Sequence, residues 1–108
     1  MKIITADKFW NINELTHVLE AQLNPLFKKH RQVDIDFNIV KDRDTIEINQ
    51  PALYEGYLFR ITVKGNELHV AKSEHYVDDI NFITLQSIIE TLQMENKEGA
   101  DIIYISGE

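Results

Sequence analysis

Two runs of alternating apolar and polar residues predict a β-hairpin over Tyr57–Ser73. The runs flank Gly65 and Asn66, and both residues tolerate the positive φ angles that two-residue hairpin turns require. This turn fixes the register of the two strands, because a slip of one residue would turn the apolar set to water. The predicted pairs are Lys64–Glu67, Val63–Leu68, Thr62–His69 and Ile61–Val70.

Another hairpin is predicted immediately before this central hairpin; we call it the first hairpin, because it comes first along the chain, and the central one the second. Gln32–Val40 alternates between apolar and polar residues throughout, which is typical of a strand with one buried face. The polar residues Lys41–Asp44 form the turn, and Thr45–Asn49 forms the returning strand, which Pro51 ends because proline cannot donate to a ladder. With a four-residue turn, the predicted cross-strand pairs are Ile39–Ile46 and Phe37–Ile48.

Helical periodicity appears twice. From Asn11, apolar residues recur at three- and four-residue steps, and either Asn11 or Asn13 can cap the start of this helix. The apolar residues are Ile12, Leu15, Leu19, Leu23 and Leu26. Pro25 interrupts this pattern, and we expect a kink or break there, or a second short helix capped by Asn24. The second helix, capped by Asp79 or Asn81 and stopped at Asn96–Gly99, has its own buried stripe. It comprises Leu85, Ile88, Ile89 and Leu92.

Asp101–Ser106 is predicted to be a strand with apolar residues on both faces. Such a strand belongs either in a covered position or at a sheet edge that is paired with another chain, because an open apolar edge promotes aggregation. A homodimer through this strand is therefore one interpretation of the sequence. The residues involved are Ile102, Ile103, Tyr104 and Ile105.

The element order α-β-β-β-β-α-β predicts a two-layer α+β fold, in which two helices cover one face of an antiparallel sheet of four to five strands. Lys2–Thr5 is a candidate for an extra N-terminal strand. No linker divides the chain, so residues 1–108 are expected to form a single domain.

Composition excludes several classes of function. The chain has no cysteine, which excludes disulfides, thiolate metal sites and cysteine nucleophiles. A net charge of −7 argues against direct binding to a nucleic-acid backbone. The apolar runs are too short to span a bilayer or to form the core of a secretory signal, so we expect no membrane association and a cytoplasmic location.

Catalytic motifs are sparse. There is no nucleophile elbow and no glycine-rich phosphate loop, so we predict no catalytic residues and no cofactor. His69, His75 and Asp78 are donors of the kind that bind divalent metals, but their spacing matches no metal motif. A metal- or small-ligand-dependent enzyme that uses this region remains an alternative hypothesis, although we predict no metal ligands.

Two features suggest protein binding. The outward face of the first hairpin is acidic, and the connector before the second hairpin is rich in large residues of the kind found at interface hot spots. The predicted partner-binding residues are Asp34, Asp36, Glu47, Leu53, Tyr54 and Tyr57. The leading hypothesis is a small acidic protein-binding module without catalytic activity, acting as a regulator, inhibitor or chaperone-like adaptor on an unidentified protein partner. The alternative is an acidic nucleic-acid mimic that blocks a DNA-binding protein.

Overall fold

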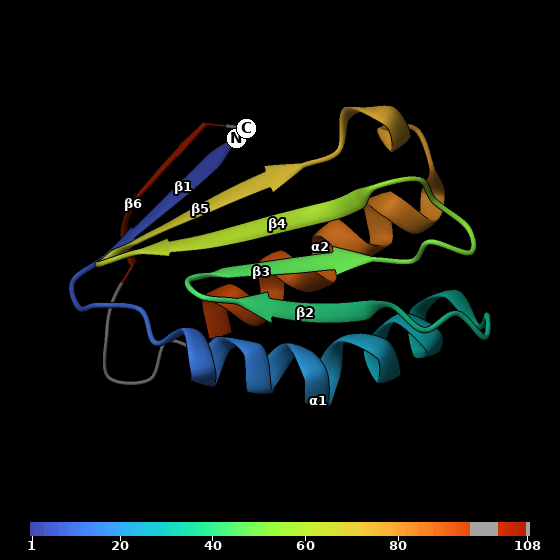
Figure 1. The fold of residues 1–108 in the computed structure, drawn as a ribbon, viewed down its shortest axis with the longest axis horizontal. Helices are drawn as coiled ribbons and strands as arrows, with labels where there is room; N and C mark the ends of the chain where they lie inside the picture. Colours follow the sequence, from blue (N-terminus) through green and yellow to red (C-terminus); the bar gives the residue numbers. More distant parts are fainter. Residues whose placement is uncertain (96–101, 108) are drawn as a thin grey trace.

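The computed structural model describes residues 1–95 and 102–107, in the order β-α-β-β-β-β-α-β (Figure 1). The elements are β1 (Lys2–Ala6), α1 (Ile12–Arg31), β2 (Asn38–Asp42), β3 (Thr45–Asn49), β4 (Tyr57–Lys64), β5 (Glu67–Lys72), the short 3₁₀ helix η1 (Glu74–Tyr76), α2 (Ile80–Glu95) and β6 (Ile102–Gly107). In the described part of the chain, no helix is both long and apolar enough to cross a membrane.

The strands form one antiparallel sheet in the order β2-β3-β4-β5-β1-β6, and the two helices pack together against it (Figure 1). The predicted α+β class is confirmed. The optional N-terminal strand is β1, which lies between β5 and β6 and makes the sheet six-stranded. This five-residue strand thus lies inside the sheet, where both of its edges are hydrogen-bonded, to β5 on one side and to β6 on the other.

The core lies between the helices and the covered face of the sheet. Phe59 of β4 stacks on Phe82 of α2 with ring centres 4.7 Å apart. Phe27 of α1 meets Phe37 edge-on at 4.8 Å. Phe27 is fully buried whereas the predicted Leu26 is only partly buried, so the apolar stripe of α1 turns slightly in its last turns.

The central hairpin forms as predicted. All four predicted pairs between β4 and β5 are present, and Gly65 adopts the left-handed conformation with φ of 62°. Asn66 does not have a positive φ; its side-chain amide instead donates to the Ala6 carbonyl at 3.1 Å. The Trp10 indole donates to the Asn66 carbonyl at 3.1 Å, so the turn also anchors the segment that joins β1 to α1.

The first hairpin differs from the prediction in two respects. Its turn contains only Arg43 and Asp44, with Arg43 in the left-handed conformation at φ of 58°. Ile39 therefore lies opposite Ile48 and not Ile46. The register moves by two residues, which preserves the face of each side chain because strands have a period of two.

The strand predicted over Gln32–Val40 is also too long, since β2 begins only at Asn38. The preceding segment lies against α1, where the side-chain amide of Asn24 bonds both backbone groups of Phe37. The amide donates to the Phe37 carbonyl at 3.0 Å and accepts from the Phe37 N–H at 2.8 Å. These bonds occupy the groups that a strand would have offered to a neighbour.

Helix α1 continues through Pro25, so the predicted break is wrong. The Asn11 side chain caps its start by accepting from the backbone N–H groups of Asn13 and Glu14. The Asp79 carboxylate caps α2 in the same way, accepting from Asn81 and Phe82. The predicted stop of α2 at Asn96–Gly99 lies outside the described residues.

Strand β6 lies at one edge of the sheet, paired with β1 alone among the described strands. The strand therefore lies at a sheet edge and not in a covered position, while its pairing with another chain stays a prediction. Ile103 and Tyr104 are each 63% exposed and Ile105 is 43% exposed. The sheet thus ends on a strand that presents large apolar side chains to its surroundings.

Candidate binding site

Most of the residues predicted to bind a partner lie at one end of the molecule, where α1 ends, β3 turns into β4 and β5 runs into η1 (Figure 1). They are Asp34, Asp36, Leu53, Tyr54 and Tyr57. We call the surface formed by segments 32–37, 50–57 and 73–79 the loop end. The remaining predicted residue, Glu47, lies farther along β3.

The acidic segment 32–37 is held in place by α1. The Lys28 ammonium lies 2.8 Å from the Asp36 carboxylate and 3.4 Å from the Asp34 carboxylate. The hydrogen bond to Asp36 is the main reason why the pKa of Lys28 is raised above its usual value. Both carboxylates stay accessible, since the side chain of Asp34 is 94% exposed and that of Asp36 is 65% exposed. Asp34 and Asp36 therefore lie beside α1, and not on the strand face where the sequence placed them.

Gln50 joins this acidic segment to the loop that follows β3. Its side-chain amide donates to the Asp36 carbonyl, and its side-chain oxygen accepts from the Ala52 N–H at 3.1 Å. The Gln50 backbone carbonyl also accepts from the N–H groups of Leu53 and Tyr54. One residue thus fixes the turn that presents Leu53, whose side chain is 56% exposed.

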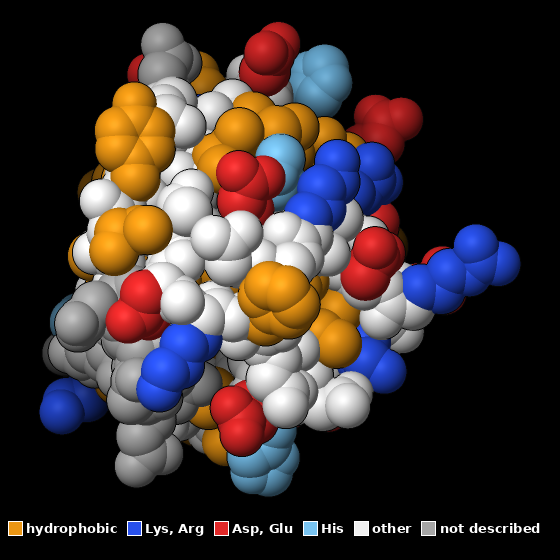
Figure 2. All heavy atoms as spheres, turned by 90° about the vertical axis from the view of Figure 1, so that its left-hand side faces the viewer, with side chains coloured by type: hydrophobic (Ala, Val, Ile, Leu, Met, Phe, Trp, Pro, Cys, Tyr) orange, Lys and Arg blue, Asp and Glu red, His pale blue; other side chains and the backbone are white. Residues whose placement is uncertain are grey.

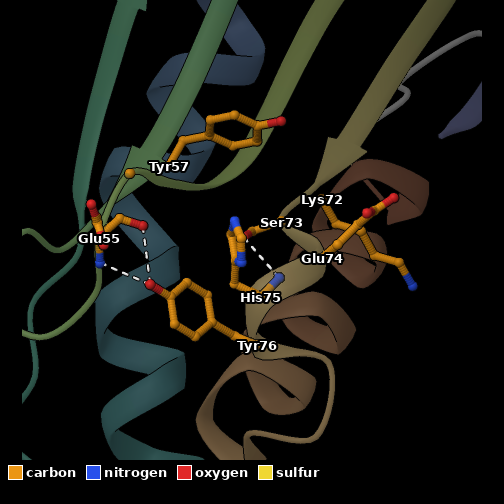
Figure 3. A pocket seen from close by; sticks show the side chains of 8 residues that line it. Glu55, Tyr57, Lys72, Ser73, Glu74, His75 and Tyr76 are labelled. Carbon is orange, nitrogen blue, oxygen red and sulfur yellow. Dashed lines mark hydrogen bonds between the residues drawn. The ribbon is translucent and has the colours of Figure 1, made fainter.

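Tyr54 supports the loop from beneath. It is 9% exposed and packs edge-on against Tyr76 with ring centres 4.9 Å apart. The Tyr76 hydroxyl donates to the Glu55 carbonyl at 3.1 Å and accepts from the Glu55 N–H at 2.9 Å (Figure 3). Burial raises the pKa of Tyr54, and the negative charge of Asp79 adds to this shift. Tyr54 is therefore part of the core that holds the loop, whereas Leu53 is exposed and Tyr57 is half-buried.

A cleft of about 630 Å³ opens between this loop and η1. Figure 3 shows the Tyr57 ring on one side of it, Tyr76 on the other and His75 between them. Charged side chains of both signs and backbone atoms also line the cleft. The remaining lining residues are Glu55, Gly56, Lys72, Ser73 and Glu74.

Tyr57 is held by a residue that the sequence did not single out. The Arg60 guanidinium lies over the Tyr57 ring, 4.2 Å from its centre, and donates to the Glu47 carboxylate at 3.1 Å. Glu47 and Arg60 are directly opposite each other on β3 and β4. In the sequence, Arg60 falls on the polar face of the central hairpin. Its contacts with Glu47 and Tyr57 follow only from the pairing of β3 with β4. Glu47 and Tyr57, both predicted, are thus connected through Arg60.

The histidines do not form a reactive cluster. His69 pairs with Glu67 at 3.0 Å on β5, and the Ser73 hydroxyl accepts from the backbone N–H of His75. Within residues 1–95 and 102–107, no group of three or more His, Asp and Glu side chains is arranged to hold a metal ion. The structure therefore does not bring His69, His75 and Asp78 together as a metal site.

Figure 2 shows the end of the molecule opposite the loop end. Acidic, basic and hydrophobic side chains are interspersed there over its exposed face.

Comparison with known proteins finds no family model, no curated protein and no solved structure that matches this chain. The functional argument therefore rests on the geometry of the chain itself.

Proposed function

We propose that this chain is a small protein-binding module of the cytoplasm that works without catalysis and docks a protein partner on its loop end. The observation that carries the proposal is the Tyr57–Arg60 stack, tied to Glu47 and placed beside the cleft. Tyrosine and arginine are the residue types that most often dominate binding energy at interfaces.

Preorganisation supports this assignment. A flexible tyrosine or arginine loses rotamer freedom when it binds, which costs about 0.5–1.5 kcal/mol for each side chain. In this protein the Arg60 side chain is already fixed between Glu47 and the Tyr57 ring, and the neighbouring loop is fixed through Gln50 and Tyr76. Much of the ordering that docking requires is therefore present in the free protein.

The charges of the loop end indicate the chemistry of the partner. The Asp34 and Asp36 carboxylates share the Lys28 ammonium, so together they keep a net negative charge. Glu55 and Glu74 are exposed nearby. Leu53 adds an exposed apolar side chain to the same surface. A protein segment that combines lysine or arginine with an apolar anchor complements this surface.

The other two hypotheses receive less support from the geometry. A nucleic-acid mimic needs rows of unpaired carboxylates, but Asp36 is paired with Lys28, and Glu47 with Arg60. A metal-dependent enzyme would need His69, His75 and Asp78 to converge, and they lie on different elements without doing so.

The test is capture of a partner from a nuclease-treated lysate of the host by the tagged protein and by two variants, Leu53→Asp and Tyr57→Ala. If these side chains are hot spots, each variant weakens binding by about 10-fold or more, since 1.4 kcal/mol corresponds to a factor of ten. The matched control is Met94→Asp. Met94 is exposed to a similar extent, 49%, but lies near the end of α2, away from the loop end.

The expected result is one stoichiometric protein that binds the parent protein and the Met94→Asp variant and is lost from both loop-end variants. Affinity should fall moderately as salt rises, because exposed carboxylates are screened. Equal capture by all the variants would refute the assignment to the loop end. Capture of nothing by the parent protein would refute the binding function.

A further inference from the structure

The two edges of the sheet differ in a way that bears on assembly. At one edge, β2 carries Lys41 and Asp42, followed directly by Arg43 and Asp44 in its turn. Charges of this kind keep a sheet edge from pairing with another chain. At the other edge, β6 has the sequence IIYISG and carries no charged side chain. Over residues 102–107, this edge therefore lacks protection by charge.

The exposed side chains of β6 lie on both faces of the sheet. Tyr104 is opposite Thr5 of β1, on the face that the helices leave open, whereas Ile105 is opposite the buried Ile4, on the covered face. Directly opposite residues of an antiparallel pair share a face. The apolar surface thus wraps around the edge, so an added strand would cover more of it than a ligand lying flat on either face.

The charge of the chain bears on whether a second copy of the protein can pair with β6. Each copy of the chain carries a net charge of −7, so two copies repel each other over most of their surfaces. Residues 102–107 of β6 add no charge to this repulsion, and the neighbouring Lys2 is paired with Glu90 at 2.6 Å. A basic partner of the kind proposed for the loop end gains no charge complementarity here.

The sequence of β6 is also complementary to itself. In a regular antiparallel pair centred on Tyr104, Tyr104 lies opposite Tyr104 of the second copy, and Ile103 lies opposite Ile105. On the inner side of β6 the pairing with β1 skips Ile103, so this register concerns the outer edge of the strand alone. Every exposed apolar side chain then has an apolar neighbour, and aromatic pairs are among the favourable cross-strand contacts. An arrangement of this kind has two-fold symmetry, which is the commonest symmetry of protein oligomers.

We propose that β6 pairs antiparallel with β6 of a second copy of this chain, centred on Tyr104, and joins the two sheets into one. The proposal is independent of the function assigned to the loop end, which lies at a different part of the fold. Tyr104 is 63% exposed and buries on the order of 100 Å² per copy. A strand-to-strand contact lies below the standard interface of about 1,600 Å², so we expect a dimer that dissociates reversibly in the micromolar range.

The test uses the absence of cysteine from the chain. A single Tyr104→Cys substitution places two thiols opposite each other across the symmetry axis. Opposite residues of an antiparallel pair have Cα atoms about 4.5–5.5 Å apart, which a disulfide spans without strain. Mild oxidation should therefore give a covalently linked dimer. The matched control is Lys41→Cys on the exposed β2 edge, which should remain monomeric.

Sedimentation of the unmodified protein provides the second measurement. Its mass should rise with concentration from 12.6 kDa toward twice that value. Ile103→Lys, which adds a charge at an exposed position, should raise the dissociation constant at least 10-fold, whereas Leu53→Asp should leave it unchanged. A monomeric mass at all concentrations would overturn the proposal and leave the edge to a strand of another protein. A dimer that persists in the Ile103→Lys variant would overturn it equally.

Discussion

Asn24 supplies the most direct test of how this fold is held together. Its side-chain amide makes two hydrogen bonds to the backbone of Phe37, at 3.0 and 2.8 Å, and so docks the segment before β2 onto α1. Phe37 is only 4% exposed. Asn24→Ala removes both bonds and leaves the Phe37 N–H and carbonyl without their partner.

The magnitude follows from these contacts. Each buried donor or acceptor that loses its partner costs about 1–3 kcal/mol, and since both bonds are only part-buried we expect the low end, about 2.5 kcal/mol for the two groups together. Alanine recovers about 0.5 kcal/mol, because it is the better helix former. The net loss in the free energy of unfolding should be about 2 kcal/mol. For a chain of this size, about 4 °C of melting temperature is lost per kcal/mol, so we expect a decrease of about 8 °C.

The assay is thermal and urea denaturation, with Asn13→Ala as the control. Asn13 is an exposed asparagine on the same helix, so its replacement changes helix propensity without removing a contact to the segment before β2. Hydrogen exchange at the Phe37 amide gives a local readout, since its protection should fall in Asn24→Ala. If Asn24→Ala were as stable as Asn13→Ala, or if Phe37 kept its protection, the role assigned to Asn24 would be wrong.

Three further predictions concern polar side chains. Burial raises the pKa of Tyr54 above 10.0, so folding favours the neutral phenol. The resulting contribution to stability is present below about pH 10 and is lost as the pH rises through the raised pKa. Above pH 10 the melting temperature of Tyr54→Phe should therefore fall less steeply than that of the parent protein, and parallel profiles would contradict this. Tyr76→Phe should lower stability by about 0.5–1.5 kcal/mol and speed exchange of the Glu55 amide, and unchanged exchange would show that the Tyr76 hydroxyl does not hold the loop. Gln93 is fully buried and both of its amide atoms lack partners among the described residues, so Gln93→Met should raise stability by about 1–3 kcal/mol; a lower melting temperature would instead indicate a bound water there.

Local sequence determined the elements whose partners are close along the chain. The central hairpin has its predicted register, because Gly65 permits a two-residue turn that sets the pairing, and the alternation of the flanking residues agrees with it. Asn11 and Asp79 cap the helices as expected, because a capping side chain bonds backbone groups two or three residues away. Each of these interactions is complete within a few residues.

The boundaries that were wrong have two causes: a partner farther along the chain, and a backbone conformation that is rare for its residue type. The segment before β2 has a strand pattern, but its backbone is bonded by Asn24, thirteen residues earlier. The first hairpin has a shorter turn than predicted, because Arg43 adopts a positive φ that its residue type rarely takes. Alternation alone does not distinguish registers that differ by two residues.

The candidate site shows the same division. The sequence identified Tyr57 and Glu47 by residue type, but only the pairing of β3 with β4 placed Arg60 between them. It identified Asp34 and Asp36 as an acidic pair, but their contact with Lys28 and the link from Gln50 to Asp36 depend on how α1 packs. The apolar character of β6 was readable from the sequence, whereas its exposure at the sheet edge followed from the place of β1, which lies between β5 and β6. Sequence patterns specify faces and turns, but which surfaces meet depends on the packing of the whole chain.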